Sequence, residues 1–449
     1  MLQTLPGLWS VARSHTPRGR LMRGVVANLG DKVSILIIQL LTIPVLTAHW
    51  GAEGYGIWLM LCTIPTYIQL SDFGIGTAAG VEITQHAAKG EYNEALEILH
   101  SAWVFLICVV SVIAAAAIAY SIYIYFAASP DDAGTFGQKN LAISICVFVI
   151  YSMVATQMSL LSVVYRATNK FATSTVMSGT LFFLEGAFAL GAVLCGQGLL
   201  LVTVGYLVIR LTGYVFYLAY LKRLEPWVTF GFGLARRSTL RRLAKPSFAA
   251  LLLTLSNALV LQGTLLTLGW FYSPAAVAVF GAARTVSRIP LQFSGLFIRP
   301  SIPELTRAIL NGNHALTRRI TILNIAIALM TTIPFAVAVV SLGPTAIAFL
   351  SHGKLDAPAN LFTFLLVAVV GNAVWTAAAT PLVATNRQAE FSHIYAGVAI
   401  CVIATPMIWQ ADLSGVGAAM ALGEAVVLGV VLRKLFVGST ISVSRETQP

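Results

Sequence analysis

Basic side chains inside apolar stretches are costly, and in this 449-residue chain they are the first sign of function. Arg284 and Arg288 are four residues apart and so share one face of a helix. At 1.5 Å per residue they lie about 15 Å and about 21 Å into a stretch that begins at residue 274. Because guanidinium groups match phosphate oxygens bidentately, the pair could hold a diphosphate in a water-filled cavity. An interhelical ion pair with Glu185 or Glu424 is the alternative.

Arg210 lies near the centre of another apolar stretch and shares its helix face with tyrosines. Tyr206 and Tyr214 stand four residues before and after it, and Tyr217 follows. A cation beside phenolic hydroxyls suits the passage of a sugar or a phosphate. The alternative is a packed aromatic seam that contains one satisfied Arg. Arg299 lies near a helix end, from which its side chain can reach the membrane surface.

Three carboxyl groups are candidates for ion coupling. Glu185 and Glu424 lie mid-span, where a carboxyl group is either paired with an Arg of another helix or protonated. Asp31 precedes Lys32 near the start of the first span and is either a coupling group or the partner of a nearby cation. The sequence leaves these alternatives open.

Membrane-spanning helices must position these groups. The chain is 57% hydrophobic and 10% charged, whereas soluble domains carry roughly a quarter charged residues. About 20 apolar residues cross a bilayer, and such runs follow one another here. We therefore predict an all-α integral membrane protein of about twelve transmembrane helices. The predicted spans are 25–48, 53–76, 100–127, 139–163, 171–195, 198–221, 246–270, 274–302, 319–342, 358–384, 390–410 and 414–436.

The distribution of Lys and Arg predicts the orientation of these spans, because cytoplasmic loops retain basic residues. With the N-terminus inside, 21 of the 28 basic residues fall in cytoplasmic segments and only Lys139 and Lys354 on the opposite face. Both termini are therefore expected in the cytoplasm. Basic residues beside membrane ends also account for the net charge of +11 without a nucleic-acid partner.

The halves of the chain contain local matches at corresponding helix ends, which indicates an internal repeat. Residues 167–170 match 384–387, Tyr55 and Gly56 match Phe280 and Gly281, and residues 89–90 match 311–312. Because each copy holds six spans, the repeats are parallel, with a substrate path expected between two lobes. The predicted divisions are a cytoplasmic segment 1–24, an N-lobe 25–221, a basic linker 222–245, a C-lobe 246–437 and a tail 438–449.

Other chemistry lacks its usual residue patterns in this sequence. It has no phosphate-binding Gly-x-x-x-x-Gly-Lys loop, and no His, Cys or carboxylate cluster has the spacing of a metal site, so we predict neither a cofactor nor a metal. A membrane glycan polymerase or ligase needs converging carboxylates and basic groups on a sizeable outer loop. The predicted outer loops are short, and their acidic residues are well separated.

Two short motifs frame the predicted second span. The first contains Gly51, Tyr55, Gly56 and Trp58 in the order Gly-x-x-x-Tyr-Gly-x-Trp. The second, at residues 70–74, ends the span with Asp72 and Gly74 in the order Leu-x-Asp-x-Gly. The chain therefore resembles the polysaccharide transporter family, the Wzx-type flippases of the multidrug/oligosaccharidyl-lipid/polysaccharide superfamily. Asp72 is expected to cap a helix or serve a hinge.

The resemblance implies a two-lobed transporter that moves a polyprenyl-diphosphate-linked oligosaccharide from the cytoplasmic to the outer leaflet of a bacterial inner membrane. It implies a cationic cavity around the diphosphate, to which Arg284, Arg288 and Arg210 would contribute with Tyr206 and Tyr214. Its expected setting is the biosynthesis of surface polysaccharide such as lipopolysaccharide O-antigen or exopolysaccharide, with membrane lipids and polysaccharide assembly proteins as partners. A drug or cation antiporter of the same superfamily is the alternative, but it would need acidic cavity groups.

Overall fold

The computed structural model describes residues 17–129, 134–298, 301–385, 387–409 and 412–445. Every regular element in these ranges is helical, which confirms the predicted fold class. Large apolar side chains cover much of the surface, among them Phe126 at 79% and Phe349 at 81% exposure. A soluble protein does not expose so much apolar surface, so lipid must cover it.

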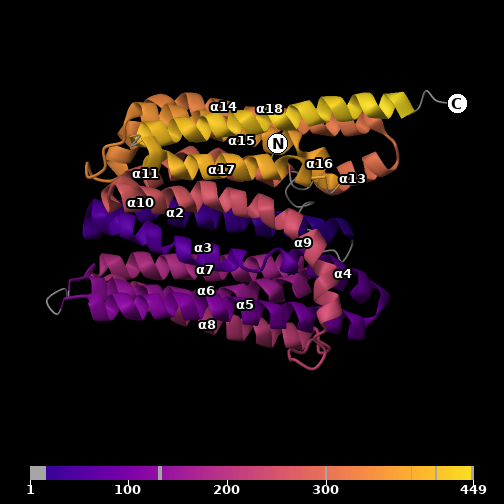
Figure 1. Cartoon of the computed structure of the whole chain (residues 1–449), viewed down its shortest axis with the longest axis horizontal. Helices are drawn as coiled ribbons and strands as arrows, with labels where there is room; N and C mark the ends of the chain where they lie inside the picture. Colours follow the sequence, from indigo (N-terminus) through magenta and orange to yellow (C-terminus); the bar gives the residue numbers. More distant parts are fainter. Residues whose placement is uncertain (1–16, 130–133, 299–300, 386, 410–411, 446–449) are drawn as a thin grey trace, which may run out of the picture. The chain divides into compact units, whose positions relative to one another are not determined.

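The first six predicted spans form the helices α2 to α8 (Figure 1). In this half α6 packs against α3, α4, α5, α7 and α8 and is therefore its central helix. Their bounds are α2 Pro17–Leu61, α3 Thr63–Leu70, α4 Ile75–Lys89, α5 Tyr92–Ala127, α6 Gln138–Ala167, α7 Phe171–Leu194 and α8 Leu199–Leu224.

The second six spans are more often interrupted. In this half α15 packs against α11, α12, α14 and α18, and α17 packs against α10 and α18. The seventh span consists of α9, a π-helical turn η1 and α10, and the eighth consists of α11 and α12. The bounds are α9 Arg237–Ala258, η1 Leu259–Gly263, α10 Thr264–Phe271, α11 Pro274–Ser287, α12 Ile289–Ile298, α13 Ile302–Leu310, α14 His314–Leu350, α15 Ala359–Ala378, α16 Thr380–Ala384, α17 Ala389–Trp409 and α18 Leu413–Arg445.

Ten helices among the described residues are long and apolar enough to cross a bilayer. One of them, Val26–Leu70, is 45 residues long and contains both the first and the second predicted span. A straight helix of that length would measure about 68 Å, roughly twice the hydrocarbon thickness. The eighth predicted span is interrupted between α11 and α12 and so falls short of a continuous helix of spanning length.

The chain folds into two compact units, and the division does not follow the order of the sequence. One unit comprises Met1–Val45 and Leu61–Phe248, and the other comprises Leu46–Met60 and Ala249–Pro449. Residues 46–60 therefore enter the second unit, although the chain on both sides of them belongs to the first. No pattern in the sequence predicted that residues 46–60 would belong to the second unit.

A break at Gly51 allows residues 46–60 to take this course. Gly51 has φ 74° and ψ −178°, a conformation that only glycine adopts readily. The Lys354 Nζ donates hydrogen bonds to the carbonyls of Thr47 and Ala48 at 2.9 and 2.7 Å. These carbonyls lie one turn before the break, where the helix no longer supplies N–H donors to them. The Lys354 ammonium group therefore caps this helix end, whose partial negative charge favours a cation.

Glycines bring this segment close to its surroundings in the second unit. A Cβ atom added to Gly56 would collide with the backbone carbonyl of Pro274, at the first turn of α11. On α11 itself, a Cβ atom added to Gly281 would collide with the side chain of Leu59. The predicted repeat paired Gly56 with Gly281: Gly56 meets backbone, which cannot give way, whereas Gly281 meets the flexible end of a side chain.

A second pair of repeat glycines ends two corresponding helices. Gly90 terminates α4 with φ 79°, and Gly312 follows α13 with φ 64°. A left-handed backbone conformation after a helix favours glycine, because a residue with a Cβ atom would be strained there. The match between residues 89–90 and 311–312 thus has the same explanation in both halves: a glycine with positive φ ends a helix. Asn386, from the third match, lies outside the described residues.

We expect Gly56→Ala to destabilise the second unit because the added methyl group meets backbone rather than a flexible side chain. Overpacking of this kind costs about 1–3 kcal/mol or more. Gly191→Ala on α7 is the matched control, since nothing lies within 4 Å of its added Cβ atom. Thermal unfolding of the purified proteins should show a lower Tm for Gly56→Ala alone. Equal Tm values for both variants would contradict the close approach.

Candidate functional site

The predicted site residues fall into two clusters of buried or half-buried charges, one in each unit. The first contains Arg210, Tyr206 and Glu185, and the second contains Arg284, Arg288 and Glu424. Arg299 lies outside the described residues.

In the first unit, Arg210 of α8 forms an ion pair with Glu185 of α7. The Arg210 Nη2 donates to the Glu185 Oε2 at 2.6 Å, and the Tyr151 hydroxyl donates to the same oxygen at 3.0 Å. The guanidinium also lies over the Tyr151 ring, 4.8 Å from its centroid. Of the two alternatives for Glu185, the structure therefore has the ion pair with an Arg of another helix.

The tyrosines near Arg210 divide between two packing environments. Tyr206 contacts the rings of Tyr151 and Phe148, with centroids 5.9 and 6.0 Å away. Tyr214 packs instead against the buried core, and Tyr217 stacks on Tyr165 at 4.7 Å. The helix face predicted from the spacing of these tyrosines is thus an aromatic seam along much of its length.

In the second unit, Arg284 of α11 contacts backbone rather than a carboxylate. Its Nη1 donates to the carbonyl of Leu261, which lies within the π-helical turn η1. A π-helical turn shifts backbone hydrogen bonds out of register, and such turns are frequent at functional sites. A guanidinium group has five N–H donors, and this hydrogen bond is the one that Arg284 makes among the described residues.

Arg288 stands at the C-terminal end of α11, just before Pro290 in α12. The charged or titratable groups that act on it most strongly are Glu424 of α18 and Tyr395 of α17. Among the described residues, neither Arg284 nor Arg288 has a carboxylate oxygen within 4.0 Å. The interhelical ion pair that was their alternative is therefore absent from this part of the chain.

Glu424 is held by neutral donors. The Asn372 Nδ2 lies 3.1 and 3.2 Å from its two oxygens, and the Trp375 Nε1 donates to Oε2 at 2.5 Å. The Trp375 ring in turn stacks on Tyr395, with centroids 5.3 Å apart. The carboxyl group is only 4% exposed, so these donors replace the water that it lacks.

The two clusters therefore differ in charge balance. In the first unit one guanidinium is matched by one carboxylate in direct contact. In the second, Arg284 and Arg288 are both half-buried, and the one buried carboxyl group, Glu424, acts on Arg288. An anion that reaches Arg284 and Arg288 would supply the missing negative charge.

The remaining predicted residues lie outside these clusters. Asp31 contacts its neighbour Lys32 at 3.3 Å. Asp72 accepts a hydrogen bond at 2.7 Å from the backbone N–H of Gly74, which has φ 74° and begins α4. This geometry is that of a turn between α3 and α4. The role of Asp31 in ion coupling stays a prediction.

The motif around Gly51 serves packing in the second unit. Tyr55 is 2% exposed, and Trp58 stacks edge-on against Trp50 with centroids 6.1 Å apart. Together with the close approach at Gly56, these contacts give the motif a structural explanation.

Sequence reasoning missed four partners of the predicted charges: Tyr151, Asn372, Trp375 and Tyr395. Asn372 and Trp375 carried a signal, because polar groups three residues apart in an apolar run share a helix face. Tyr151 carried none, since its contact with Glu185 joins α6 and α7 across the unit.

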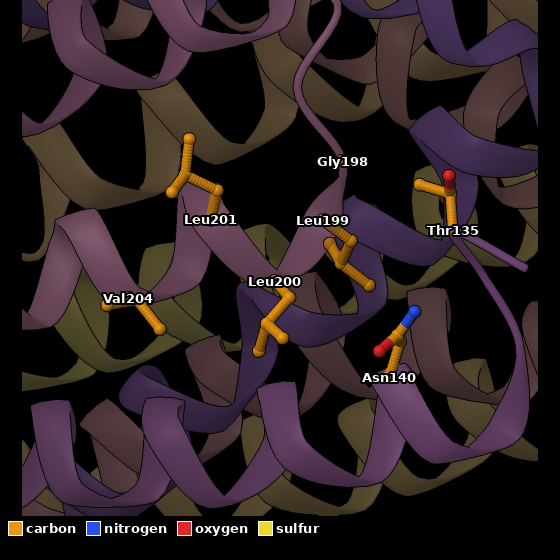
Figure 2. A pocket seen from close by; sticks show the side chains of 7 residues that line it. All are labelled: Thr135, Asn140, Gly198, Leu199, Leu200, Leu201 and Val204. Carbon is orange, nitrogen blue, oxygen red and sulfur yellow. The ribbon is translucent and has the colours of Figure 1, made fainter. Parts of the chain in front are cut away.

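A surface pocket of about 460 Å³ lies in the first unit, near the start of α6 and α8 (Figure 2). Figure 2 shows the side chains of Leu199, Leu200 and Val204 on one side and those of Thr135 and Asn140 on the other. The described residues that line it are all uncharged. None of the predicted site residues lies there.

Sequence comparison matches residues 21–308 to the family described as polysaccharide biosynthesis protein. This range covers well over half of the chain. Comparison with curated protein sequences gave no significant match.

Solved structures share the fold at low sequence identity. An inward-facing multidrug resistance MATE family transporter of the MOP superfamily has 12% identity and a TM-score of 0.72, covering 95% of this chain and 100% of its own. The lipid II flippase MurJ, in an inward closed conformation, has 13% identity and a TM-score of 0.66 over 92% and 87%. The MATE multidrug transporter DinF-BH has 13% identity and a TM-score of 0.62 over 95% and 96%. These likenesses confirm the predicted two-lobed helical architecture.

Breaking the buried ion pair should destabilise the protein far more than breaking an exposed one. Removing one partner of a buried pair costs about 3–5 kcal/mol. A double-mutant cycle on Glu185→Gln and Arg210→Gln, followed by thermal unfolding, should therefore show a strong coupling. The exposed pair Arg387 and Glu390, 2.6 Å apart, is the control and should couple by less than about 1 kcal/mol. Equal coupling in the two cycles would contradict the assignment.

Proposed function

We propose that this chain, which belongs to the polysaccharide biosynthesis protein family, is a flippase for a polyprenyl-diphosphate-linked oligosaccharide. It would carry this lipid from the cytoplasmic to the outer leaflet of a bacterial inner membrane, with both termini in the cytoplasm. The proposed setting is the assembly of a surface polysaccharide such as O-antigen or exopolysaccharide. The protein would act as a transporter rather than as an enzyme.

The observation that carries the proposal is that Arg284 and Arg288 have no carboxylate oxygen within 4.0 Å among the described residues. A cation held mid-span by neutral groups alone is costly, and an anionic substrate would lower that cost. A diphosphate offers several oxygens to the planar guanidinium groups, and such charge-assisted hydrogen bonds are stronger than those between neutral groups. Arg210, by contrast, is already neutralised by Glu185. We therefore assign the diphosphate to Arg284 and Arg288 and leave Arg210, Tyr206 and Tyr214 the lesser role of lining the path of the glycan.

Alternating access would supply the movement. The related folds include transporters described as inward-facing, inward closed, bent and straight, so this architecture adopts several conformations. In our proposal the two lobes rock so that the bound diphosphate faces each leaflet in turn while the glycan follows an aqueous path. Polysaccharide assembly proteins would supply and remove the lipid-linked glycan.

Glu424 is our candidate for ion coupling, because its oxygens accept hydrogen bonds from neutral groups and the cation that acts on it, Arg288, belongs to the proposed substrate site. Glu185 is engaged by Arg210, and Asp31 by Lys32. A Glu424→Gln protein that flips substrate with an unchanged dependence on the ion gradient would remove Glu424 from this role.

The antiporter alternative predicts a surplus of acidic groups where this chain has a surplus of basic ones. Multidrug transporters share the fold, yet two half-buried guanidinium groups against one carboxyl group in the second unit would repel a cationic drug. The charge balance thus favours an anionic substrate.

Disruption of the gene should cause a lipid-linked glycan to accumulate in the inner leaflet, and complementation should reverse this. Arg284→Ala combined with Arg288→Ala should abolish complementation, because each charge-assisted contact contributes about 1.5–3 kcal/mol. The exposed Arg318→Ala on α14 is the control and should complement fully. Mass spectrometry of extracted lipids, with protein levels matched, gives the measurement.

Full complementation by the double variant would show that the diphosphate binds elsewhere. If no lipid-linked sugar accumulates while sensitivity to cationic drugs rises, the protein is an antiporter rather than a flippase.

A further inference from the structure

The chain between α8 and α9 is an ordered layer on the end of α5. Residues 225–236 follow one membrane span directly, and α9 leads into the next, so this layer lies at a membrane surface. The backbone N–H of Arg236 donates to the Ser101 Oγ at 2.9 Å, and the Thr239 hydroxyl donates to Glu97 at 2.7 Å. The carbonyl of Thr229 lies 2.9 Å from the His100 Nε2.

Aromatic contacts fasten the same layer. The Trp103 ring of α5 contacts Phe230 and Phe232, with centroids 5.8 and 5.3 Å away. Phe232 nevertheless remains 66% exposed, and Leu234 is 43% exposed. Two apolar side chains are thus held outward on a fixed backbone beside a membrane span.

Three acidic groups around this layer are already engaged. Glu97 pairs with Arg236 at 3.2 Å, Glu82 pairs with Arg242 at 2.7 Å, and Glu225 pairs with Lys170. Each of these carboxylates therefore has a cation of its own.

Arg237 and Arg241 are left without a carboxylate in the part of the chain that the structure describes. Both are exposed, and their spacing of four residues places them on one face of α9. Thr239 and Leu243, in the same helical turns, are buried, so α9 has a buried face and an exposed face here. Like charges at this spacing destabilise a helix, and an anion bound outside the protein would relieve their repulsion.

We propose that Arg237 and Arg241 bind the headgroup of an anionic phospholipid while Phe232 and Leu234 enter the interfacial region of the same leaflet. Two guanidinium groups on one helix face can share the oxygens of one lipid phosphate. Basic residues beside a membrane gain affinity for anionic lipids, and apolar neighbours add to it. The occupant is a lipid of the bilayer, distinct from the transported substrate.

The contact would fix the connection between the two halves of the sequence to the membrane surface. Phosphatidylcholine offers the same phosphate, but its choline group cancels the charge and adds bulk, so a lipid with net negative charge is favoured. Salt should weaken the contact, because exposed charges are screened within about 10 Å at 0.1 M.

Native mass spectrometry of the delipidated full-length protein tests the proposal with dioleoylphosphatidylglycerol and dioleoylphosphatidylcholine as probes. The wild-type protein should retain the anionic lipid preferentially. Arg237→Gln combined with Arg241→Gln should weaken that binding roughly tenfold or more, since each basic residue adds to the binding affinity for an anionic lipid surface. Arg236→Gln combined with Arg242→Gln removes the same charge from cations that already have partners, and should preserve most of the binding.

Equal losses in the two double variants would show a diffuse field rather than a site, and would overturn the proposal. So would equal binding of both lipids by the wild-type protein, or unchanged binding by the Arg237 and Arg241 variant. If that variant instead loses farnesyl diphosphate and keeps phosphatidylglycerol, the surface belongs to the substrate. Unchanged Tm values establish that both variants are folded.

Discussion

A charge inside an apolar helix bundle must find compensation, and this constraint organises the interior of the protein. Each unit meets it differently. Arg210 and Glu185 compensate each other directly, with Tyr151 beneath the guanidinium. Arg284 donates to a backbone carbonyl, and Arg288 is stabilised by the charge of Glu424 without a direct ion pair among the described residues. The first arrangement is balanced in charge, whereas the second has two guanidinium groups to one carboxyl group, and the proposed diphosphate site follows from this difference.

Backbone geometry explains the sequence motif that first suggested the family. Gly51 breaks the first long helix, and Gly56 then approaches the carbonyl of Pro274 where no side chain would fit. Lys354 caps the carbonyls exposed by the break. Through this segment the first and second spans contribute to the second unit as well as to their own. The motif is therefore a requirement of the fold, and a similar motif in a relative says little about its substrate.

Much of the fold could be predicted because hydropathy acts over whole segments. The spans, their order and the repeat follow from runs of about 20 apolar residues and from glycines at helix ends. The spacing of Arg284 and Arg288 also placed them on one helix. Their partners could not be predicted, since the carbonyl of Leu261 becomes available only through a π-helical turn that leaves no mark in the sequence. Likewise Glu424 meets Asn372 and Trp375 across α15 and α18, a contact set by packing.

The central claim is that the second unit binds an anion through Arg284 and Arg288. Equilibrium binding to the purified wild-type protein tests it directly, with farnesyl diphosphate as the anion and tetraphenylphosphonium as an apolar cation. The account predicts saturable binding of the diphosphate that weakens as salt rises, and no specific binding of the cation. Saturable binding of tetraphenylphosphonium without any binding of the diphosphate would contradict it.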